Sequence, residues 1–228
     1  MSAGERGAPP FEVVLFDLDG TITNPQAGIT SCVAHALADA GIVVEDPATL
    51  TGYIGPPLRD GFARFHGLEG ERGERAVAVY RERYVAAGIL DLEVVRGMPA
   101  LVRELDRSGV TVAIATSKVT AMAETIIDHL ELADAVTFVG GATLDGARGT
   151  KPEVVAHTLD GLGVAGGRHV ALVGDRHHDV DGALAHGLVA IGVRWGFAGP
   201  DELEAAGAHV VVDDVPALRA ALVGTEAA

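Results

Sequence analysis

The sequence predicts an α/β fold: a Rossmann-like parallel sheet with helices on both faces, and a small all-α cap domain inserted after the first strand. Three observations lead to this prediction. The apolar run at residues 11–17 is typical of a buried strand. From residue 96 onward, strand-like and helix-like segments alternate, which indicates a parallel sheet covered by helices. Between these parts, from about residue 25 to residue 92, no strand-like run of any length occurs.

These patterns divide the chain of 228 residues, which is long enough for one large core and a smaller insert. Residues 1–10 are rich in Gly, Pro and Ala and are expected to form a flexible tail. Residues 11–23 and 96–228 are expected to form the α/β core domain, and residues 24–95 the helical cap domain. Because the insert follows the first strand, it is expected to emerge at the carboxyl edge of the sheet and to cover the site there.

Within the insert, two segments have helical periodicity. "SCVAHALADAG" places Val33, Ala36 and Leu37 on one face and ends at Gly41, a residue suited to a helix C-terminus. "AVAVYRERYVAAG" has a similar pattern and ends at Gly88. The glycines and prolines of "GYIGPPLRDG" predict a stiff turn between cap helices.

The second part of the core alternates regularly between the two kinds of segment. Helices are predicted where residues repeat with helical spacing, and strands where short runs of β-branched and small apolar residues occur. In chain order the segments are helix "MPALVRELDRSG", strand "VTVAIAT", helix "VTAMAETIIDHLEL", strand "AVTFVG", helix "KPEVVAHTLDGLG", strand "HVALVGD", helix "DVDGALAHG", strand "LVAIGV", helix "PDELEAAG", strand "HVVVDD" and helix "VPALRAAL".

Composition and charge exclude several classes of function. The formal net charge of -15 opposes binding to nucleic acid or to an anionic membrane surface. No apolar run reaches the roughly 18 residues that would span a bilayer, and "MSAGERGAPP" does not have the pattern of a signal peptide. The single cysteine, Cys32, rules out an intrachain disulfide, so a reducing, cytoplasmic setting is expected.

The residues that could carry chemistry follow the predicted strands. Parallel strands bring their carboxyl ends to one edge of the sheet, so side chains placed just after them should converge. Candidates of this kind are the aspartates Asp17, Asp19, Asp175 and Asp179, the polar residues Thr116, Ser117 and Lys118, and Lys151 at the start of a helix.

Carboxylates gathered in a half-buried cleft repel one another unless a cation holds them. A site with oxygen ligands and room for water suits Mg²⁺. Thr116 and Lys151 would supply donors for an anion beside the metal. A metal, an anion pocket and a carboxylate nucleophile together predict phosphoryl transfer through an aspartyl-phosphate.

Four short segments, "FDLDGT", "ATSK", "TKPE" and "GDRHHD", resemble the ordered motifs of the haloacid dehalogenase-like (HAD) superfamily. The resemblance implies Asp17 as nucleophile and Asp19 as general acid and base. It implies phosphate binding by Thr116 and Lys151, to which Gly20 and Ser117 are added as candidates. It also implies Mg²⁺ held by the Asp17 carboxylate, the Asp19 backbone carbonyl and Asp175, with Asp179 beside it or acting through water.

The insert resembles the helical cap of the phosphoglycolate phosphatase and β-phosphoglucomutase branch. Within that branch, "YIGPPLRDGF" and "GDRHHDVDGA" are most similar to phosphoglycolate phosphatases and 5′-nucleotidase-like members. Arg59 is the candidate for reading the far end of the substrate, since a guanidinium can pair with a carboxylate or phosphate or stack on a base. His177 and His178 are assigned to the metal-site loop, where a surface role or a place outside the metal ligands is favoured over a zinc site.

The expected activity is a Mg²⁺-dependent phosphatase acting on a small phosphorylated metabolite, either phosphoglycolate or a nucleoside 5′-monophosphate, by a monomer or homodimer. A phosphomutase of the β-phosphoglucomutase type is the enzymatic alternative, because the motifs do not report whether water or sugar reaches the intermediate. Dehalogenation is disfavoured because dehalogenases of the superfamily lack the second aspartate. A non-catalytic phospho-binding regulatory protein is the remaining alternative, and the intact acidic residues and Lys151 argue against it.

Overall fold

The computed structural model describes residues 10–224 and divides the chain into two compact units. The core unit contains the residues up to Ile22 and those from Val95 onward, and the cap unit is Thr23–Val94. These boundaries lie one residue from the predicted ones. Of the predicted flexible tail at residues 1–10, all but Pro10 lies outside the described residues.

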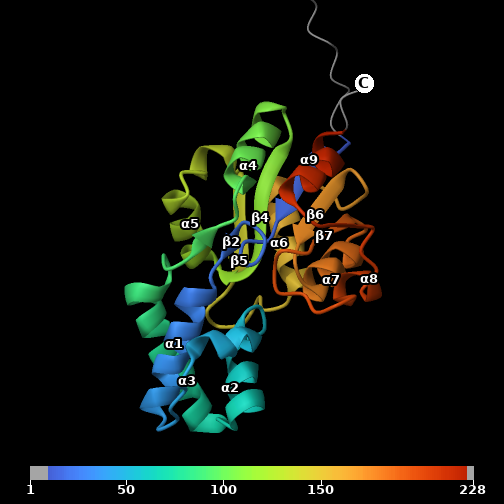
Figure 1. The fold of residues 1–228 in the computed structure, drawn as a ribbon. Helices are drawn as coiled ribbons and strands as arrows, with labels where there is room; N and C mark the ends of the chain where they lie inside the picture. Colours follow the sequence, from blue (N-terminus) through green and yellow to red (C-terminus); the bar gives the residue numbers. More distant parts are fainter. Residues whose placement is uncertain (1–9, 225–228) are drawn as a thin grey trace, which may run out of the picture. The chain divides into compact units, whose positions relative to one another are not determined.

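The core unit is built on a parallel sheet whose strands have the spatial order β5-β4-β1-β6-β7-β8 (Figure 1). In chain order the strands are β1 (Val13–Phe16), β4 (Thr111–Val119), β5 (Phe138–Ala142), β6 (Val170–Gly174), β7 (Val189–Val193) and β8 (Val210–Val212). The α/β class and the parallel sheet predicted from the sequence are confirmed.

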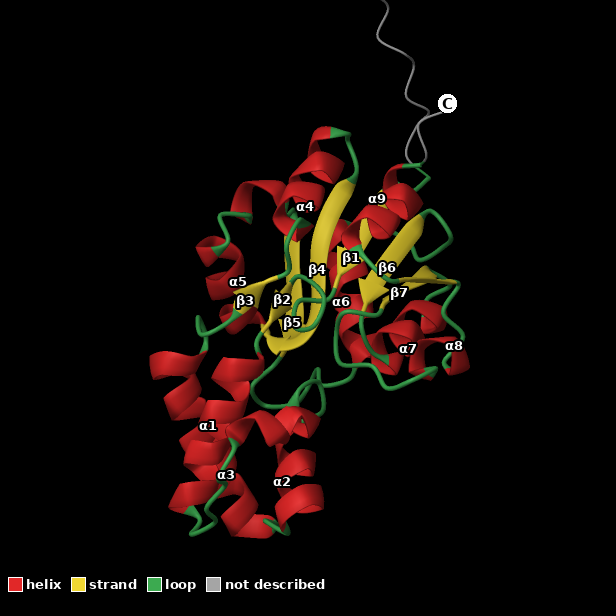
Figure 2. Ribbon diagram, viewed as in Figure 1, coloured by secondary structure: helices red, strands yellow, loops and turns green. Residues whose placement is uncertain are grey.

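Helices cover both faces of this sheet, as Figure 2 shows in red around the yellow strands. They are α4 (Met98–Arg107), α5 (Thr120–His129), α6 (Lys151–Leu162), α7 (His177–Ala185), α8 (Glu202–Ala205) and α9 (Val215–Val223), with a short 3₁₀ turn at Ala133–Ala135. The strand order explains the two layers of helices. From β1 the strands follow one another outward to β5 in one direction, and from β6 to β8 in the other. Because connections between parallel strands are right-handed, the two directions place their helices on opposite faces of the sheet.

One face of the sheet packs on α6 and α7 and forms a continuous apolar core. The strands contribute alternate residues to it, and the helices contribute one side each. The strand members are Val13, Leu15, Ala113, Ala115, Val170, Leu172 and Ala190, and the helix members are Val154, Val155, Leu159, Val180, Ala183 and Leu203. Most of these side chains are small or β-branched, in keeping with an aromatic content of only 4%.

The strand order places β1 at the topological switch point of the sheet. Strands β4 and β6 lie on either side of β1. From β4 the sheet continues to β5 at one edge, and from β6 it continues through β7 to β8 at the other. Ligands of open α/β sheets bind at such a point. The chain segments that follow β1 and β6 and the last residues of β4 therefore meet at one place in the core unit.

The cap unit is helical apart from a two-stranded antiparallel ribbon, β2 (Thr23–Asn24) with β3 (Glu93–Val94). Its helical segments are α1 (Gln26–Asp39), a 3₁₀ segment at Pro47–Tyr53, α2 (Leu58–His66), α3 (Gly70–Arg83) and a π turn at Tyr84–Gly88. The two predicted cap helices are present, and both begin earlier than predicted. Among the described residues, no helix is long and apolar enough to cross a membrane.

The segment "GYIGPPLRDG" is only partly the turn that its glycines and prolines predict. Its second half belongs to α2, which begins at Leu58 directly after Pro57. Proline before or at the first helical turn is compatible with a helix because that turn needs no backbone N–H bond. Arg59 therefore lies on the first turn of α2 and not in a connecting loop.

Candidate active site

Asp17 and Asp19 are held by the loop that leaves β1. The Asp17 backbone N–H donates to the Val173 carbonyl (2.8 Å), which extends the β1–β6 pairing by one residue beyond the strand. Asp17 is buried at 7% exposure. Gly20 turns the chain immediately afterwards with a φ of +86°, a conformation that favours glycine.

Strand β4 brings Thr116, Ser117 and Lys118 to the same edge. The strand is longer than predicted and includes these residues, but its pairing with β5 shifts register between Thr116 and Val119. Such an irregularity re-aims the side chains it contains. The Thr116 hydroxyl accepts a bond from the Lys118 backbone N–H (3.2 Å), and the Lys118 ammonium lies 2.8 Å from Asp19 Oδ2.

Lys151 is the first residue of α6, and local capping fixes it there. Glu153 Oε2 accepts bonds from the backbone N–H groups of Gly149 (3.0 Å) and Thr150 (2.9 Å), so a capping box starts the helix. Lys151 has 5% exposure. The motif "TKPE" thus explains why α6 begins at Lys151, and this start places the Lys151 side chain in the core.

The three donors of the Lys151 ammonium meet three oxygens of the core. Nζ lies 2.8 Å from Asp17 Oδ1, 2.6 Å from Asp179 Oδ1 and 2.9 Å from the carbonyl of Ala115. Burial alone would lower the pKa of Lys151, but the charges of Asp17 and Asp179 outweigh it and raise that pKa. Lys151 is therefore a permanent cation between the nucleophile candidate and Asp179.

The chain contains only two lysines, Lys118 and Lys151, whose side chains are 6% and 3% exposed and pair with carboxylates of this site. All other side-chain cations of the chain, apart from histidines, are arginines. The compact ammonium of lysine directs three donors from one atom, whereas the guanidinium of arginine spreads five donors over a rigid plane. The pairing of Lys118 with Asp19 was not predicted from the sequence, because it depends on the register shift in β4.

Asp175 follows β6 and is enclosed by two glycines from other loops. A β-carbon on Gly20 would lie 2.2 Å from Asp175 Oδ2, and one on Gly196 would lie 2.3 Å from Asp175 Cβ. The backbone N–H of Phe197 donates to Asp175 Oδ2 (2.7 Å). The loop after β7 therefore positions Asp175, a role that its sequence "RWGF" does not reveal by itself.

The same loop also contacts the segment after β1. The indole N–H of Trp195 donates to the carbonyl of Thr21 (3.1 Å). Trp195 and Phe197 thus tie the loops that carry Asp17 and Asp175 to one another through a third loop. Neither residue was predicted to belong to the site.

Asp179 lies on the first turn of α7, where its Oδ2 accepts a bond from the backbone N–H of Arg176 (3.0 Å). The helix begins at His177, two residues earlier than predicted. His177 and His178 are therefore residues of the first helical turn, and their assignment to a loop was wrong. Burial lowers the pKa of His178, and the neighbouring side chains of His177 and Arg176 lower it further.

Asp17, Asp175 and Asp179 form a cluster suited to a metal ion. Each offers a carboxylate oxygen, and these oxygens lie within 4.8 Å of one another. All three side chains are buried, and Asp175 Oδ1 has no hydrogen-bond partner among the described residues. An all-oxygen donor set with an unsatisfied buried oxygen fits Mg²⁺.

The pKa values of the acidic groups show how strongly the site opposes excess negative charge. Burial raises the pKa of Asp175 well above its usual value, and the charges of Asp179 and Asp17 raise it further. Burial also raises the pKa of Asp179, although Lys151 opposes the change. For Asp19, burial raises the pKa against the opposing effect of Lys118. Such groups hold a proton more readily than exposed aspartates do, or bind a cation instead.

Arg59, the predicted specificity residue, forms an ion pair within the cap unit. Its Nη2 lies 2.6 Å from Glu74 Oε1 on α3, and 69% of the Arg59 side chain is exposed. Exposed pairs of this kind are weak and exchange readily. A role for Arg59 in substrate recognition stays a prediction.

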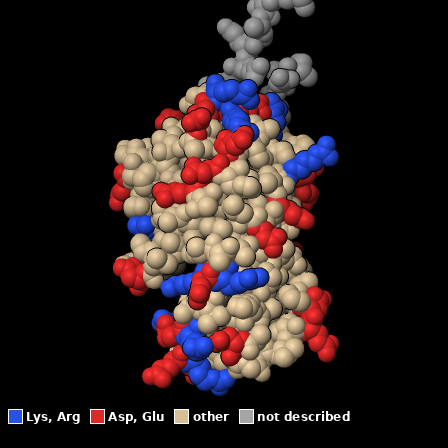
Figure 3. Space-filling view, turned by 90° about the vertical axis from the view of Figure 1, so that its left-hand side faces the viewer, with Lys and Arg blue, Asp and Glu red and all other residues tan. Residues whose placement is uncertain are grey.

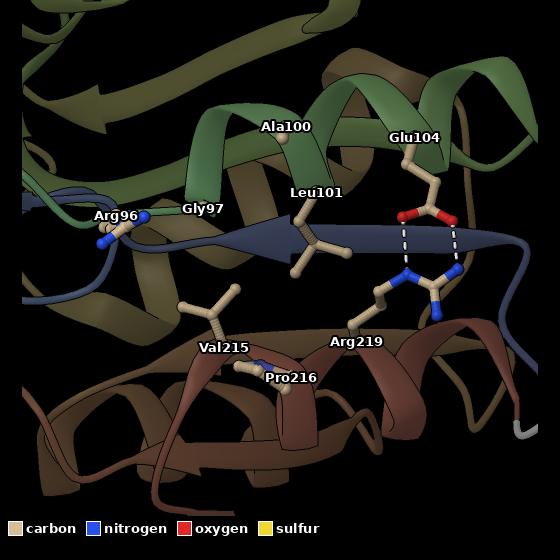
Figure 4. Close-up of a pocket in the computed structure, with 8 residues that line it drawn as sticks. All are labelled: Arg96, Gly97, Ala100, Leu101, Glu104, Val215, Pro216 and Arg219. Carbon is tan, nitrogen blue, oxygen red and sulfur yellow. Dashed lines mark hydrogen bonds and ion pairs between the residues drawn. The ribbon is translucent and has the colours of Figure 1, made fainter.

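A groove of about 460 Å³ lies between α4 and α9, and none of the predicted site residues lines it (Figure 4). Its walls are formed by Arg96, Gly97, Ala100, Leu101, Glu104, Val215, Pro216 and Arg219. Glu104 accepts two bonds from Arg219, from Nε (2.8 Å) and from Nη2 (2.5 Å). This bidentate pair links the last helix to α4, so the groove belongs to the packing of the C-terminal helix.

Comparison with known proteins identifies the family. A model of the haloacid dehalogenase-like hydrolase family matches residues 14–193. The chain belongs to the haloacid dehalogenase-like hydrolase family. Within it, the relatives place the chain among the phosphatases: a 5′-nucleotidase of Pseudomonas aeruginosa is 41% identical over 92% of this chain and 94% of its own.

Two further similarities bear on the activity of this HAD-like hydrolase. The tyrosine-protein kinase PtkA of Mycobacterium tuberculosis is 39% identical over 92% of this chain and 70% of its own. The crystal structure of a predicted phosphatase from Clostridium acetobutylicum superposes with a TM-score of 0.86 at 36% identity, covering 92% of this chain and 96% of that one. Relatives that are 25% to 30% identical are named phosphoglycolate phosphatase.

Proposed function

We propose that this HAD-like phosphatase hydrolyses a small phosphomonoester with Mg²⁺, through an aspartyl-phosphate formed on Asp17. The observation that carries the proposal is the arrangement around Asp17. Its carboxylate shares a buried site with Asp175 and Asp179, and Lys151 is bonded to it at 2.8 Å. A carboxylate bonded to a permanent cation beside a metal site is suited to nucleophilic attack on phosphorus.

Asp19 is the general acid and base of the proposed reaction. It lies in the same loop as Asp17, and burial raises its pKa. Its Oδ2 pairs with Lys118, whereas its buried Oδ1 has no hydrogen-bond partner among the described residues. A proton on Oδ1 would pass to the leaving oxygen when Asp17 attacks phosphorus. The resulting carboxylate would then take a proton from the water that hydrolyses the intermediate.

Asp17, Asp175 and Asp179 are the residues that would hold Mg²⁺, together with the backbone carbonyl of Asp19. When bound, the ion would neutralise phosphate charge and orient the phosphoryl group for in-line attack. Gly20, Thr116, Ser117 and Lys151 are the proposed phosphate-binding residues. Lys151 already bonds three oxygens, so a direct bond to phosphate would replace one of these contacts.

A nucleoside 5′-monophosphate is the first substrate candidate, because the relative with 41% identity is named 5′-nucleotidase and the two chains match over nearly their whole lengths. Phosphoglycolate is the other substrate candidate, supported by relatives of lower identity. The two differ in the group distal to phosphate, which is a base and sugar in one and a carboxylate in the other. Arg59 could interact with either.

The relative named tyrosine-protein kinase supports a second candidate function, transfer of a phosphoryl group to a protein tyrosine. The 39% identity extends over 92% of this chain, so the similarity covers nearly all of it. The difference from hydrolysis lies in the acceptor and in the phosphoryl donor. Incubation with γ-labelled ATP and analysis of labelled protein would report this activity separately.

Phosphate release from a small substrate panel tests the proposal. The panel contains nucleoside 5′-monophosphates, phosphoglycolate and hexose phosphates, each with Mg²⁺ and with a chelator, and Asp17→Asn serves as the inactive control. We expect Mg²⁺-dependent release that is fastest with a nucleoside monophosphate. Conversion of hexose phosphates without phosphate release would indicate a mutase. Absence of release from every substrate, or equal release by Asp17→Asn, would contradict the proposal.

A further inference from the structure

Three side chains outside the acidic cluster lie together on the first turns of α7: His177, His178 and Asp181. Each offers a nitrogen or oxygen ligand atom, and these atoms lie within 4.8 Å of one another. Positions 177 and 181 are four residues apart on the helix and positions 178 and 181 are three apart, so their side chains share a face. Asp181 is exposed and both histidines are half-buried, which leaves the cluster accessible from solvent.

Glu202 on α8 fixes the orientation of one of these rings. Its Oε1 accepts bonds from His177 Nδ1 (2.8 Å), the His177 backbone N–H (2.9 Å) and Arg176 Nε (2.8 Å). Its Oε2 accepts a bond from the Gly199 backbone N–H (2.9 Å). A carboxylate that receives so many donors is ionised and acts only as an acceptor.

The tautomer of His177 follows from this arrangement. Because Glu202 only accepts, His177 Nδ1 must carry the proton, and the lone pair of the neutral ring lies on Nε2. Histidines that ligate metals in proteins show this pattern, with one ring nitrogen donating to a carboxylate and the other facing the ion. The two imidazole rings lie close, with centroids 3.8 Å apart and planes inclined by 43°.

We propose that His177, His178 and Asp181 form a second metal site that takes a borderline transition-metal ion such as Zn²⁺ or Co²⁺, with Glu202 as the group that orients His177. Imidazole nitrogens favour such ions, whereas Mg²⁺ prefers oxygen ligands. The site is therefore chemically distinct from the all-oxygen cluster of Asp17, Asp175 and Asp179. Three protein ligands leave a position for water or another small ligand.

Nearby charges act on the proposed metal site in opposite directions. The N-terminus of α7 and Arg176 contribute positive potential, which disfavours a cation. Asp181, Glu202 and the overall charge of -15 favour one. Arg176 is itself bonded to Glu202, so part of its charge is already balanced.

Titration of untagged, full-length protein with Co²⁺ and Zn²⁺ tests the site, with Mg²⁺ in large excess so that the all-oxygen cluster is filled. Calorimetry gives the stoichiometry, and the visible absorption of Co²⁺ reports nitrogen coordination independently of catalysis. We expect one ion per chain. We also expect His178→Ala and Asp181→Asn each to weaken binding, and Glu202→Gln to weaken it by roughly 10–100-fold, as loss of an orienting carboxylate does elsewhere.

His129→Ala is the matched control, because His129 is an exposed histidine next to an aspartate at the end of another helix of the core unit. It should bind both ions as wild type does. If His129→Ala weakens binding as much as His178→Ala does, the ions bind to scattered surface histidines and the proposal is overturned. It is also overturned if the wild-type protein binds neither ion. A third contradicting result is that Asp175→Asn abolishes binding while His178→Ala leaves it unchanged. Asp181→Asn provides an independent answer if His178→Ala does not fold.

Discussion

At the scale of single residues, Asp19 is the group whose environment most directly predicts a kinetic result. It is partly buried and its pKa is raised, one oxygen pairs with Lys118, and the other has no hydrogen-bond partner among the described residues. General acid catalysis of this kind contributes about 10²–10⁴-fold to a rate. The size of this contribution depends on how strongly departure of the leaving group requires a proton.

Asp19→Asn keeps the shape of the side chain and removes its proton chemistry. We expect phosphorylation of the enzyme by an alkyl phosphate to slow by about 10²–10⁴-fold. The same step with p-nitrophenyl phosphate should slow much less, because that leaving group departs without a proton. Rapid-quench measurement of the two substrates gives the comparison. Equal losses would mean that Asp19 only shapes the loop or orients the metal.

The individual acidic and basic residues could be predicted because each follows a strand end and the topology brings those ends together. Asp17, Asp175, Asp179 and Lys151 are gathered in the structure as the motifs indicate. The partner of Asp19 could not be predicted. Lys118 reaches Asp19 only because β4 shifts register after Thr116, and no local pattern in "ATSKVT" predicts that shift.

At the scale of elements, the loop after β7 acts on the site through its backbone. Gly196 lies so close to Asp175 that a β-carbon would come within 2.3 Å of it. Gly196→Ala should therefore displace the Asp175 carboxylate and weaken Mg²⁺ binding, with a loss of activity that additional Mg²⁺ partly restores. Isothermal titration with Mg²⁺ measures the affinity directly.

Gly199→Ala is the control for this substitution. It lies three residues further along the same loop, and its β-carbon would meet Glu202 at 3.7 Å, an ordinary contact. Its backbone N–H bond to Glu202 is retained. Mg²⁺ affinity should be unchanged in Gly199→Ala. If both variants bind Mg²⁺ as wild type does, the loop does not position Asp175.

Glu202 links α8 to the start of α7, and its pKa predicts a pH-dependent contribution to stability. Burial would raise the pKa, but bonds from the backbone of His177 and Gly199 and from Arg176 outweigh it and lower the pKa from 4.5 to about 2. A lowered acid pKa adds stability that is complete above the unfolded-state value and is lost as the pH falls toward the folded value. Without screening, this change corresponds to about 3–4 kcal/mol, and solvent screening of this partly exposed carboxylate reduces the contribution to roughly 2–3 kcal/mol.

Glu202→Gln should therefore lower the free energy of unfolding by roughly 2–3 kcal/mol at pH 7. The difference from wild type should shrink as the pH falls from about 4.5 toward about 2, because Glu202 of the unfolded chain then takes up a proton while Glu202 of the folded protein is still ionised. Urea denaturation of both proteins between pH 7 and pH 3 measures this. A difference that stays constant across that range would show that shape, and not charge, makes the contribution.

The order and type of the core elements could be predicted because alternating apolar strands and helices specify a doubly wound sheet. Helix starts were less predictable. In "GDRHHDV" the helix begins at His177 because Asp179 and Glu202 accept the backbone N–H groups of its first turn, and Glu202 is 25 residues away in sequence. In "GYIGPPLRDG" the prolines obscure a helix that begins directly after them.

At the scale of the whole molecule, the acidic cluster should make stability depend on the proposed Mg²⁺ ion. Burial and mutual repulsion raise the pKa values of Asp175 and Asp179, so the cluster destabilises the metal-free protein at neutral pH. A ligand that binds only the folded state adds roughly 2.7 kcal/mol at a hundredfold excess over its Kd.

Mg²⁺ should therefore raise the melting temperature of wild type by several degrees, and Asp175→Asn should blunt the effect because it removes a charge that faces the ion. The melting temperatures are measured across a Mg²⁺ titration at constant ionic strength, which separates binding from general screening. An equal rise in wild type and in Asp175→Asn would place the ion elsewhere.

The central claim, that Asp17 carries the phosphoryl group, is tested most directly by trapping that group. Asp19→Asn is mixed with p-nitrophenyl phosphate and Mg²⁺, because this variant should form the intermediate and hydrolyse it slowly. After acid quench, borohydride reduces an aspartyl-phosphate to homoserine, which peptide mass spectrometry locates. We predict homoserine at position 17, dependent on substrate and Mg²⁺. A phosphoryl group trapped on another residue, or hydrolysis with a burst of p-nitrophenol but no modification at position 17, would contradict the claim.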